Sequence, residues 1–153
     1  MPIDNDSANS FYANLAAGFQ HKNVPAISSA LAPGFSATAL DGTSGDAKTW
    51  ADVVKSEFDG VNHSNVQFKV NHVTPRGEDA EVGVTREFRG KNSKGQTYQG
   101  TVDTTDTLTR HEGGVRLKNS RITGRNLSLD GKQYNIAVQP QIMHLVQGCG
   151  DDY

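Results

Sequence analysis

The sequence predicts an α+β domain, in which a curved antiparallel β-sheet carries three helices across one face. Apolar residues recur at helical spacing within the first 60 residues, and a two-residue alternation follows as far as residue 130. Glycine-containing turns divide the alternating part into strands. A chain of 153 residues suits a single domain that buries a core of its own.

The first 60 residues contain three stretches with the apolar spacing of an amphipathic helix. The first helix is expected over residues 7–22. A second, short helix opens at Val24 and Pro25, where the missing N–H of proline costs nothing. The third is expected over residues 46–59 and is stopped by Gly60. The stripes that should face the sheet comprise Phe11, Leu15, Phe19, Ile27, Ala30, Leu31, Trp50, Val53, Val54 and Phe58.

Strand-like alternation replaces the helical spacing after His63. A short strand is expected before it, at residues 35–40. The hairpin of residues 97–123 is the clearest signal, because two runs rich in Thr, Val and Leu flank a turn that contains two glycines. Four long strands in succession predict an antiparallel meander. The turns that separate these strands are expected at residues 75–79, 92–96 and 111–114.

The chain is expected to divide into three parts. Residues 1–6 are polar and are predicted to be disordered, and residues 7–130 form the domain. Residues 131–153 form a C-terminal extension that is packed on the domain or partly disordered.

Composition excludes several classes of function. The formal net charge is −2, with acidic and basic residues interspersed, so we expect no nucleic-acid partner. No run reaches the roughly 18 apolar residues of a membrane span, and the N-terminus has no apolar signal-peptide core. We therefore expect no membrane association and favour a cytoplasmic location. The single cysteine, Cys149, and the scattered histidines predict neither an internal disulfide nor a metal site, and no cofactor is expected.

Register arithmetic places polar groups inside the sheet. If the last hairpin turns at residues 111–114, Asp106 lies opposite Asn119, and Arg121 lies diagonal to Asp106. The preceding hairpin brings His72 opposite Val82. One transverse layer facing the helices would then contain His72, Asp106, Asn119 and Arg121. A slip of one residue would turn the whole set outward. The helix residues best placed to close this layer are Tyr12 and Trp50.

Four segments in this order resemble the nuclear transport factor 2-like superfamily. They are F-Y-A-N-L-A-A-G-F-Q-H-K-N-V-P-A-I from Phe11, A-P-G-F-S-A-T from Ala32, T-D-T-L-T-R-H-E-G-G-V-R-L from Thr105 and S-L-D-G-K from Ser128. The resemblance implies a cone-shaped domain with the three helices on the concave face of the sheet. The superfamily includes ketosteroid isomerases, SnoaL-like polyketide cyclases and scytalone dehydratases, so the resemblance implies a pocket without fixing a chemistry.

Two interpretations of the polar layer remain open. In the first, a desolvated Asp106 or His72 acts as a general base, and Tyr12 or Asn119 polarises a carbonyl. The resemblance supports this, because related isomerases and cyclases use an acidic residue for proton transfer. In the second, Asp106 and Arg121 form a partly buried, hydrogen-bonded pair that fixes the geometry of the sheet. Arg86, which stands among valines, would snorkel to solvent or bind an anion.

Two functions from different classes follow. The first is a binding domain that holds a small apolar or aromatic molecule and is homodimeric through the outer face of the sheet. The second is a cofactor-free isomerase, cyclase or dehydratase, which would need an open pocket of several hundred cubic ångströms. The candidate ligand-binding residues are Tyr12, Trp50, Arg86, Asn119 and Arg121, and the outer face would present Thr101, Asp103, Thr105, Thr107 and Thr109.

Overall fold

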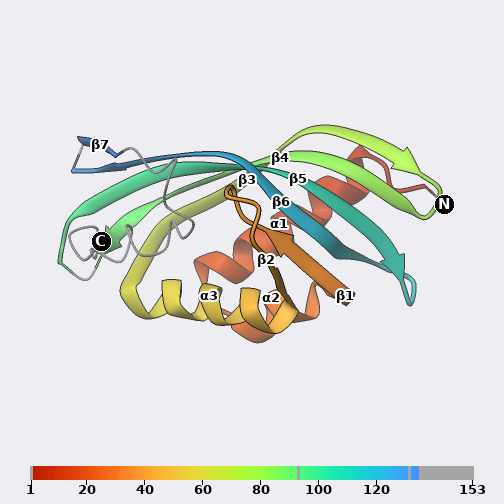
Figure 1. Ribbon diagram of the computed structural model, residues 1–153, viewed down its shortest axis with the longest axis horizontal. Helices are drawn as coiled ribbons and strands as arrows, with labels where there is room; N and C mark the ends of the chain where they lie inside the picture. Colours follow the sequence, from red (N-terminus) through yellow and green to blue (C-terminus); the bar gives the residue numbers. More distant parts are fainter. Residues whose placement is uncertain (1, 93, 131, 135–153) are drawn as a thin grey trace.

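A single strongly curved sheet arches over three helices (Figure 1). The computed structural model describes residues 2–92, 94–130 and 132–134. The predicted C-terminal extension therefore lies outside the described residues, except for the three that form β7. The α+β class and the curved, mostly antiparallel sheet are confirmed. In chain order the elements are α1 (Asn5–Gln20), α2 (Val24–Ser29), β1 (Leu31–Thr38), β2 (Ser44–Asp46), α3 (Ala47–Gly60), β3 (Val61–Arg76), β4 (Asp79–Asn92), β5 (Thr97–His111), β6 (Gly114–Leu129) and β7 (Lys132–Tyr134).

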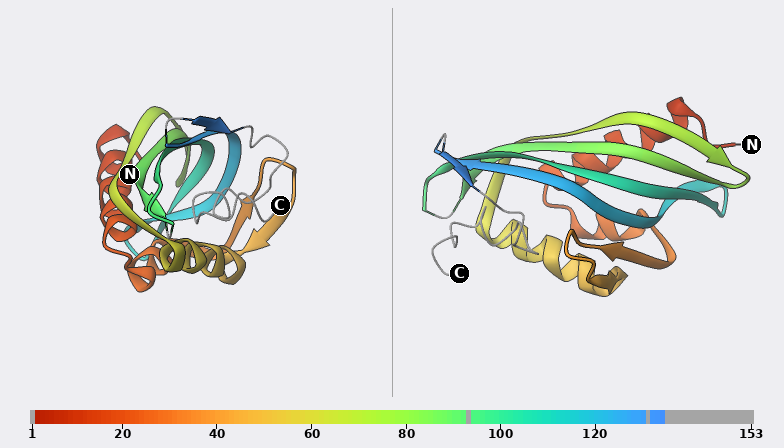
Figure 2. Two further views of the ribbon diagram at one scale, coloured as in Figure 1. Left: turned by 90° about the vertical axis from the view of Figure 1, so that its left-hand side faces the viewer. Right: turned by 45° about the horizontal axis from the view of Figure 1, so that its top comes forward.

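The strand order in the sheet is β2-β1-β6-β5-β4-β3, and β7 pairs with the free side of the end of β6. Strands β3 to β6 form the predicted antiparallel meander. Strand β1 joins the sheet in parallel with β6, a long-range pairing that local patterns do not reveal. Figure 2 shows the sheet curling round, with α1 and α3 lying across its open side. The space enclosed between helices and sheet is where the core and the candidate site lie.

Helix α1 begins earlier than predicted, and this corrects the disordered N-terminus. The carboxylate of Asp4 accepts a hydrogen bond from the Ser7 backbone N–H at 2.8 Å and so caps the helix at its first turn. Ile3 is fully buried in the core. The guanidinium of Arg110 donates to the Pro2 carbonyl at 3.3 Å, which places the N-terminus beside β5. Residues 2–6 are therefore part of the domain.

Helix α3 keeps close to its predicted bounds, and α2 begins where predicted but ends at Ser29, so that Leu31 begins β1 instead of continuing the helix. Pro25 stands in the first turn of α2, and the Asn23 side chain accepts from the Ala26 N–H at 3.2 Å. At the start of α3 the Asp46 side chain accepts from the Thr49 N–H at 2.9 Å. Both helices thus begin where a short polar side chain can satisfy a backbone donor.

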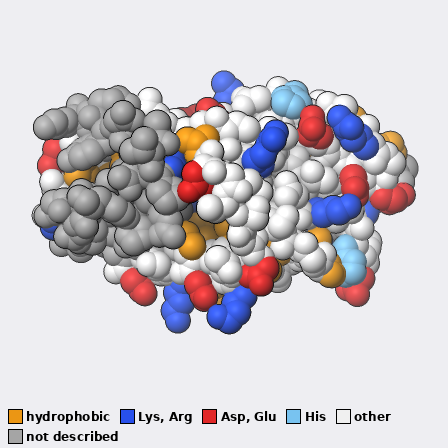
Figure 3. Space-filling model, in the orientation of Figure 1, with side chains coloured by type: hydrophobic (Ala, Val, Ile, Leu, Met, Phe, Trp, Pro, Cys, Tyr) orange, Lys and Arg blue, Asp and Glu red, His pale blue; other side chains and the backbone are white. Residues whose placement is uncertain are grey.

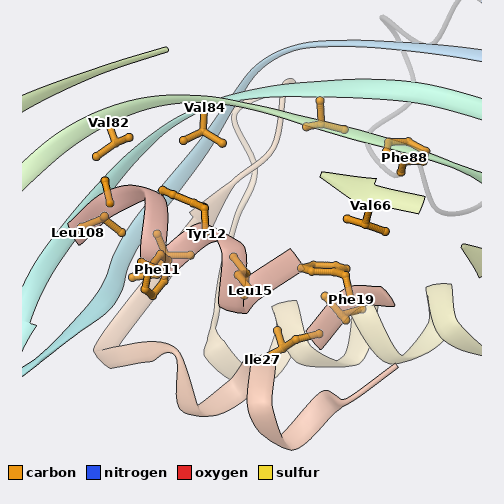
Figure 4. Close-up of a cluster of buried hydrophobic side chains, with 14 of the residues drawn as sticks. Phe11, Tyr12, Leu15, Phe19, Ile27, Val66, Val82, Val84, Phe88 and Leu108 are labelled. Atoms are coloured by element: carbon orange, nitrogen blue, oxygen red, sulfur yellow. The ribbon is translucent and has the colours of Figure 1, made fainter. Parts of the chain in front are cut away.

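The core lies between the helical stripes and the inner face of β3 to β6 (Figure 4). Within it the Phe19 ring lies 5.9 Å from that of Phe58 and 6.0 Å from that of Phe68. Such edge-to-face and tilted arrangements are the favourable ones for aromatic pairs. Buried side chains from both layers include Phe11, Tyr12, Leu15, Phe19, Ile27, Val66, Val82, Val84, Phe88 and Leu108.

The last hairpin turns at the predicted place, but its register changes farther along the strands. Glu112 and Gly113 form the turn with φ of 53° and 81°, the left-handed values of a two-residue hairpin. Pairing from His111 and Gly114 to Leu108 and Leu117 follows the prediction. Thr107 then pairs with Asn119, so Lys118 is the extra residue of a β-bulge. The partners of Thr104 to Thr107 are therefore shifted by one residue, and a second bulge at Thr123 shifts those from Asp103 onward by two.

Candidate functional site

Asp106 lies on the inner face of the sheet, near the middle of β5. Its neighbours across the sheet are Val82 on β4 and Ser120 on β6. Only 3% of its surface is exposed. A carboxylate in such a position needs hydrogen bonds to offset the loss of its hydration.

Two hydroxyl groups supply these hydrogen bonds. Tyr12 on α1 donates from its phenolic oxygen to Oδ2 of Asp106 at 2.6 Å. Ser120 on β6 donates from Oγ to Oδ1 at 2.6 Å. Both distances are short, as expected when the acceptor is ionised. We call these three residues the Asp106 cluster, and it ties helix α1 to two strands of the sheet.

Burial dominates the electrostatics of this cluster. It raises the pKa of Asp106 above the ordinary 3.8, and the hydrogen bonds from Ser120, Tyr12 and Thr104 oppose the rise. Burial also raises the pKa of Tyr12 well above 10.0, and the neighbouring Asp106 adds to that shift. Tyr12 is therefore a protonated donor at any ordinary pH, whereas Asp106 is the group of the pair that can exchange a proton.

A partly open pocket of about 90 Å³ lies next to the cluster, between the helices and the sheet. It is much smaller than the pockets of about 300–1,000 Å³ that hold drug-sized ligands, and the several hundred cubic ångströms expected for an enzyme are not found there. We call it the inner cavity. Its lining is mainly apolar, with polar groups at a few positions: Leu15, Phe19, Trp50, Val53, Val54, Phe68, Arg86, Val102, Thr104, Asp106, Leu117, Ser120 and Ile122.

Three of the sequence-predicted residues meet Asp106 at this place. Tyr12 contacts Asp106 directly, and Trp50 and Arg86 line the inner cavity. The Trp50 ring packs 5.5 Å from that of Phe35 and is half-buried. The proximity of these groups is a structural fact, and the roles assigned to them stay predictions.

His72 lies elsewhere, and its predicted place in the layer is wrong. Strand β3 has a bulge at Asn71, because Val70 pairs with Val84 whereas His72 pairs with Gly83. The bulge turns His72 to the outer face, where it is exposed. Its imidazole ring covers the Gly83 backbone, and any larger residue at Gly83 would collide with it. His72 cannot act on a group in the inner cavity from there.

The bulge at Lys118 likewise turns Asn119 and Arg121 outward. Asn119 donates to Oγ of Ser36 on β1 at 2.7 Å. Arg121 pairs with Thr105 and is exposed, on the face opposite to Asp106. The predicted buried pair of Asp106 and Arg121 is therefore wrong, because the sheet lies between the two side chains.

Sequence reasoning missed Ser120, which the bulge brings to the inner face beside Asp106, and Thr104, which stands two residues from Asp106 on β5 and therefore shares its face. A signal for the bulge exists in the sequence. The apolar residues of this strand change from odd to even positions between Leu117 and Ile122, which a strictly alternating strand cannot accommodate on one face.

Charge is evenly dispersed on the face in Figure 3, where acidic and basic side chains alternate over the described part of the chain. Among the described residues, no group of three or more His, Cys, Asp or Glu side chains could hold a metal ion. In the same part of the chain, no helix has both the length and the apolar character needed to cross a membrane.

No protein-family model matches the sequence, and neither does any curated protein. Solved structures do match. A conserved protein from Planctomyces limnophilus superposes with a TM-score of 0.70 at 8% identity, over 77% of this chain and 93% of that one. An NTF2-like protein from Cytophaga hutchinsonii gives a TM-score of 0.66 at 14% identity, over 79% and 98% of the two chains.

A ketosteroid isomerase-like protein from Erwinia carotovora atroseptica gives a TM-score of 0.64 at 14% identity, over 82% of this chain and 97% of that one. At these identities the likeness concerns the fold alone. The chain therefore has the nuclear transport factor 2-like fold, as the sequence resemblance implied.

Proposed function

We propose that the chain is a binding protein for a small molecule, which it holds in the inner cavity against the Asp106 cluster. One observation carries the proposal: a buried carboxylate with two hydroxyl donors forms part of the wall of an otherwise mainly apolar cavity. An apolar lining with a few convergent polar groups is typical of ligand sites. The similarity to a ketosteroid isomerase-like protein supports a ligand-binding role in general terms.

The cavity sets limits on such a ligand. The apolar part of the ligand would pack against Leu15, Trp50 and Val54. Asp106 and Thr104 would accept a hydrogen bond from the polar part of the ligand, since an ionised carboxylate has about four acceptor sites and retains at least one beside its hydroxyl partners. A volume of about 90 Å³ favours a molecule of few heavy atoms.

Filling the cavity tests this proposal. Amide NMR spectra of the labelled protein would be recorded with neutral, acidic and basic fragments no larger than benzoate. Ile122 lines the cavity and is half-buried, so Ile122→Phe should occupy the space and abolish the shifts caused by a bound fragment. The neighbouring Arg121 faces outward, so Arg121→Phe is the matched control and should bind like the wild type. Equal binding by both variants would show that the fragments bind elsewhere.

Proton transfer by Asp106, without a cofactor, is the second candidate. The observation that favours it is the raised pKa of the buried Asp106, which brings this carboxyl closer to the range useful for a general base. The small volume of the cavity and the two hydroxyl donors on the carboxylate make simple binding the better-supported function.

Hydrogen exchange at carbon distinguishes the two functions. Small ketones would be incubated with the protein in heavy water, and loss of the proton next to the carbonyl would be followed by NMR. A general base should accelerate this loss, and Asp106→Asn should remove the acceleration while the fragment still binds. Exchange at the same rate in both proteins would rule out proton transfer by Asp106.

A further inference from the structure

The hydrogen bonds of the Asp106 cluster fix the direction in which its protons point. Tyr12 donates to Oδ2 of Asp106 and Ser120 donates to Oδ1, both at 2.6 Å. These short distances fit an ionised carboxylate, which can only accept hydrogen bonds. The hydrogen bond from Thr104 also opposes the rise in the pKa of Asp106, so a third hydroxyl proton points to the same carboxylate. The protons of all three hydroxyl groups are therefore engaged within this site.

The polar side chains at this end of the inner cavity offer a ligand a set of acceptors. Thr104, Asp106 and Ser120 all line the cavity. A hydroxyl group has one proton and two lone pairs, so a hydroxyl that donates to Asp106 presents only lone pairs to the cavity. The carboxylate has about four acceptor sites and retains at least one. These three side chains can thus accept a hydrogen bond from a ligand but have no proton to donate to it.

Arg86 lines the same cavity at a distance from this end. Its neighbour across the sheet is Val102, which precedes Asp106 by four residues on β5, or about 13 Å of extended backbone. Only 9% of its surface is exposed, so its charged head does not snorkel to water. The guanidinium carbon lies instead 4.8 Å from the centroid of the Phe19 ring and 5.0 Å from that of Phe88. The two ends of the cavity therefore differ in the groups that they present.

The wall around the Asp106 end is apolar. Leu117 and Ile122 lie on either side of Ser120 along β6. Leu15 follows Tyr12 on α1 by three residues, which is about one helical turn. A ligand held here can place one donor at the cluster and must leave the rest of its surface against carbon atoms. An ammonium group has three donors and would lose most of its hydration, so a neutral group with a single donor fits this wall better.

We propose that the inner cavity selects a small neutral alcohol, whose hydroxyl group donates a hydrogen bond to the Asp106 cluster and whose apolar part fills the rest of the cavity. This inference rests on the proposed binding function and names its ligand class. A ketone of the same shape would bring another acceptor against the lone pairs of the cluster, and both would lose their hydration without gaining a partner. The direction of the hydrogen bonds also leaves Tyr12 without a proton for polarising a carbonyl, the role predicted for it in proton transfer.

Three probes of nearly one shape test the inference in the wild-type protein. Amide NMR titrations at neutral pH would compare cyclopentanol with cyclopentanone and cyclopentylammonium. We expect the alcohol to bind roughly tenfold more tightly than the ketone, the effect of one hydrogen bond to a charged acceptor, and more tightly than the ammonium. A ketone or ammonium affinity that matches or exceeds that of the alcohol would overturn the inference and leave the proposed binding function intact. Failure of all three probes to bind would overturn both.

Variants locate the preference. Asp106→Asn keeps the shape of the side chain and replaces one oxygen by an amide donor, so the difference between alcohol and ketone should disappear or change sign. Asp103 is exposed on the other face of β5, so Asp103→Asn removes an equal charge and should leave the preference unchanged. A preference retained in Asp106→Asn, or lost equally in Asp103→Asn, would overturn the assignment to the cluster. Circular dichroism would verify the fold of each variant, and the wild-type comparison decides the ligand class if Asp106→Asn does not fold.

Discussion

The hydroxyl of Tyr12 connects a helix to a carboxylate that would otherwise be costly to bury. The donor belongs to α1 and the acceptor to β5, and the two residues are separated by 94 positions in the chain. The aromatic ring is itself buried and packs 5.3 Å from the ring of Phe68. The Tyr12 side chain therefore has two roles: its ring packs in the apolar core, and its hydroxyl supplies a hydrogen bond to the buried carboxylate.

Tyr12→Phe keeps the ring and removes the donor. We expect a loss of about 1–3 kcal/mol in the free energy of unfolding, because Oδ2 of Asp106 would lose its partner in a buried site. Urea denaturation of the single variants and of the double variant with Asp106→Leu would measure the coupling. In the Asp106→Leu background the same Tyr12→Phe change should have little effect. If Tyr12→Phe lowered the free energy of unfolding equally in the Asp106→Leu background, the effect would come from altered packing and not from the hydrogen bond.

The proton on Asp106 gives a second prediction. Burial raises the folded-state pKa above 3.8, so the folded protein binds this proton more tightly than the unfolded chain does. The stabilising contribution of Asp106 is thus complete below the unfolded pKa and is lost as the pH rises through the folded pKa.

Asn does not titrate, so the comparison of wild type with Asp106→Asn isolates this effect. The wild-type free energy of unfolding, minus that of Asp106→Asn, should decrease as the pH is raised through the folded-state pKa. Denaturant titrations over a pH series would measure it. The surface carboxylates whose pKa is lowered, such as Asp79, contribute with the opposite sign but cancel in the difference. A difference that grows with pH would contradict the assignment.

Single-residue bulges decide what the strands present to the interior. The turn at Glu112 and Gly113 follows from local chemistry and could be predicted, as could the four long strands. The position of Asp106 on the inner face was also correct. The bulges at Asn71 and Lys118 were not foreseen, and each reversed the predicted orientation of the polar residues beyond it.

The sequence nevertheless contains the trace of each bulge. Apolar residues of β3 occupy even positions from Val66 to Val70 and an odd one at Val73, which changes parity across Asn71. Such a change of parity within one strand indicates a bulge, and a bulge at Asn71 requires His72 to face outward. The parallel pairing of β1 with β6 has no comparable trace, since it depends on contacts between segments distant in the chain.

The N-terminal segment before α1 offers a test at the level of one element. Ile3→Ala should lower the free energy of unfolding by about 2–5 kcal/mol, because it opens a cavity at a fully buried site. Ser10→Ala on the exposed side of α1 is the control and should be nearly neutral. Thermal and urea unfolding would measure both. A neutral Ile3→Ala would mean that the domain begins later, as the polar composition of residues 1–6 suggests.

The whole molecule has a polar outer sheet face, which we propose as a homodimer contact. A groove of about 560 Å³ crosses the strands there, and its lining includes Glu87, Arg89, Gln99 and Asn126. Glu87 and Arg89 are exposed, carry opposite charges and lie two residues apart on one strand. A two-fold axis between them would bring each beside its opposite in a second copy.

Light scattering coupled to gel filtration tests this contact. The wild type should have the mass of two chains, and Glu87→Lys should shift the population toward one chain, because it places like charges together. Lys55→Glu changes an exposed charge on α3, away from the sheet, and should leave the mass unchanged. A wild-type mass of one chain, or dissociation by both variants, would contradict the proposed contact.

The parallel pairing of β1 with β6 has a consequence for synthesis. Ser36 and Asn119 are partners, 83 positions apart in the chain. When β1 leaves the ribosome, β6 has not yet been synthesised. The backbone N–H and C=O groups of β1 that will pair with β6 therefore stay hydrogen-bonded to water for most of the elongation time. The hydroxyl of Tyr12 likewise lacks its acceptor until Asp106 on β5 has been synthesised. Assembly of this domain is therefore a late event, and chains truncated before the last hairpin should be substrates for proteases.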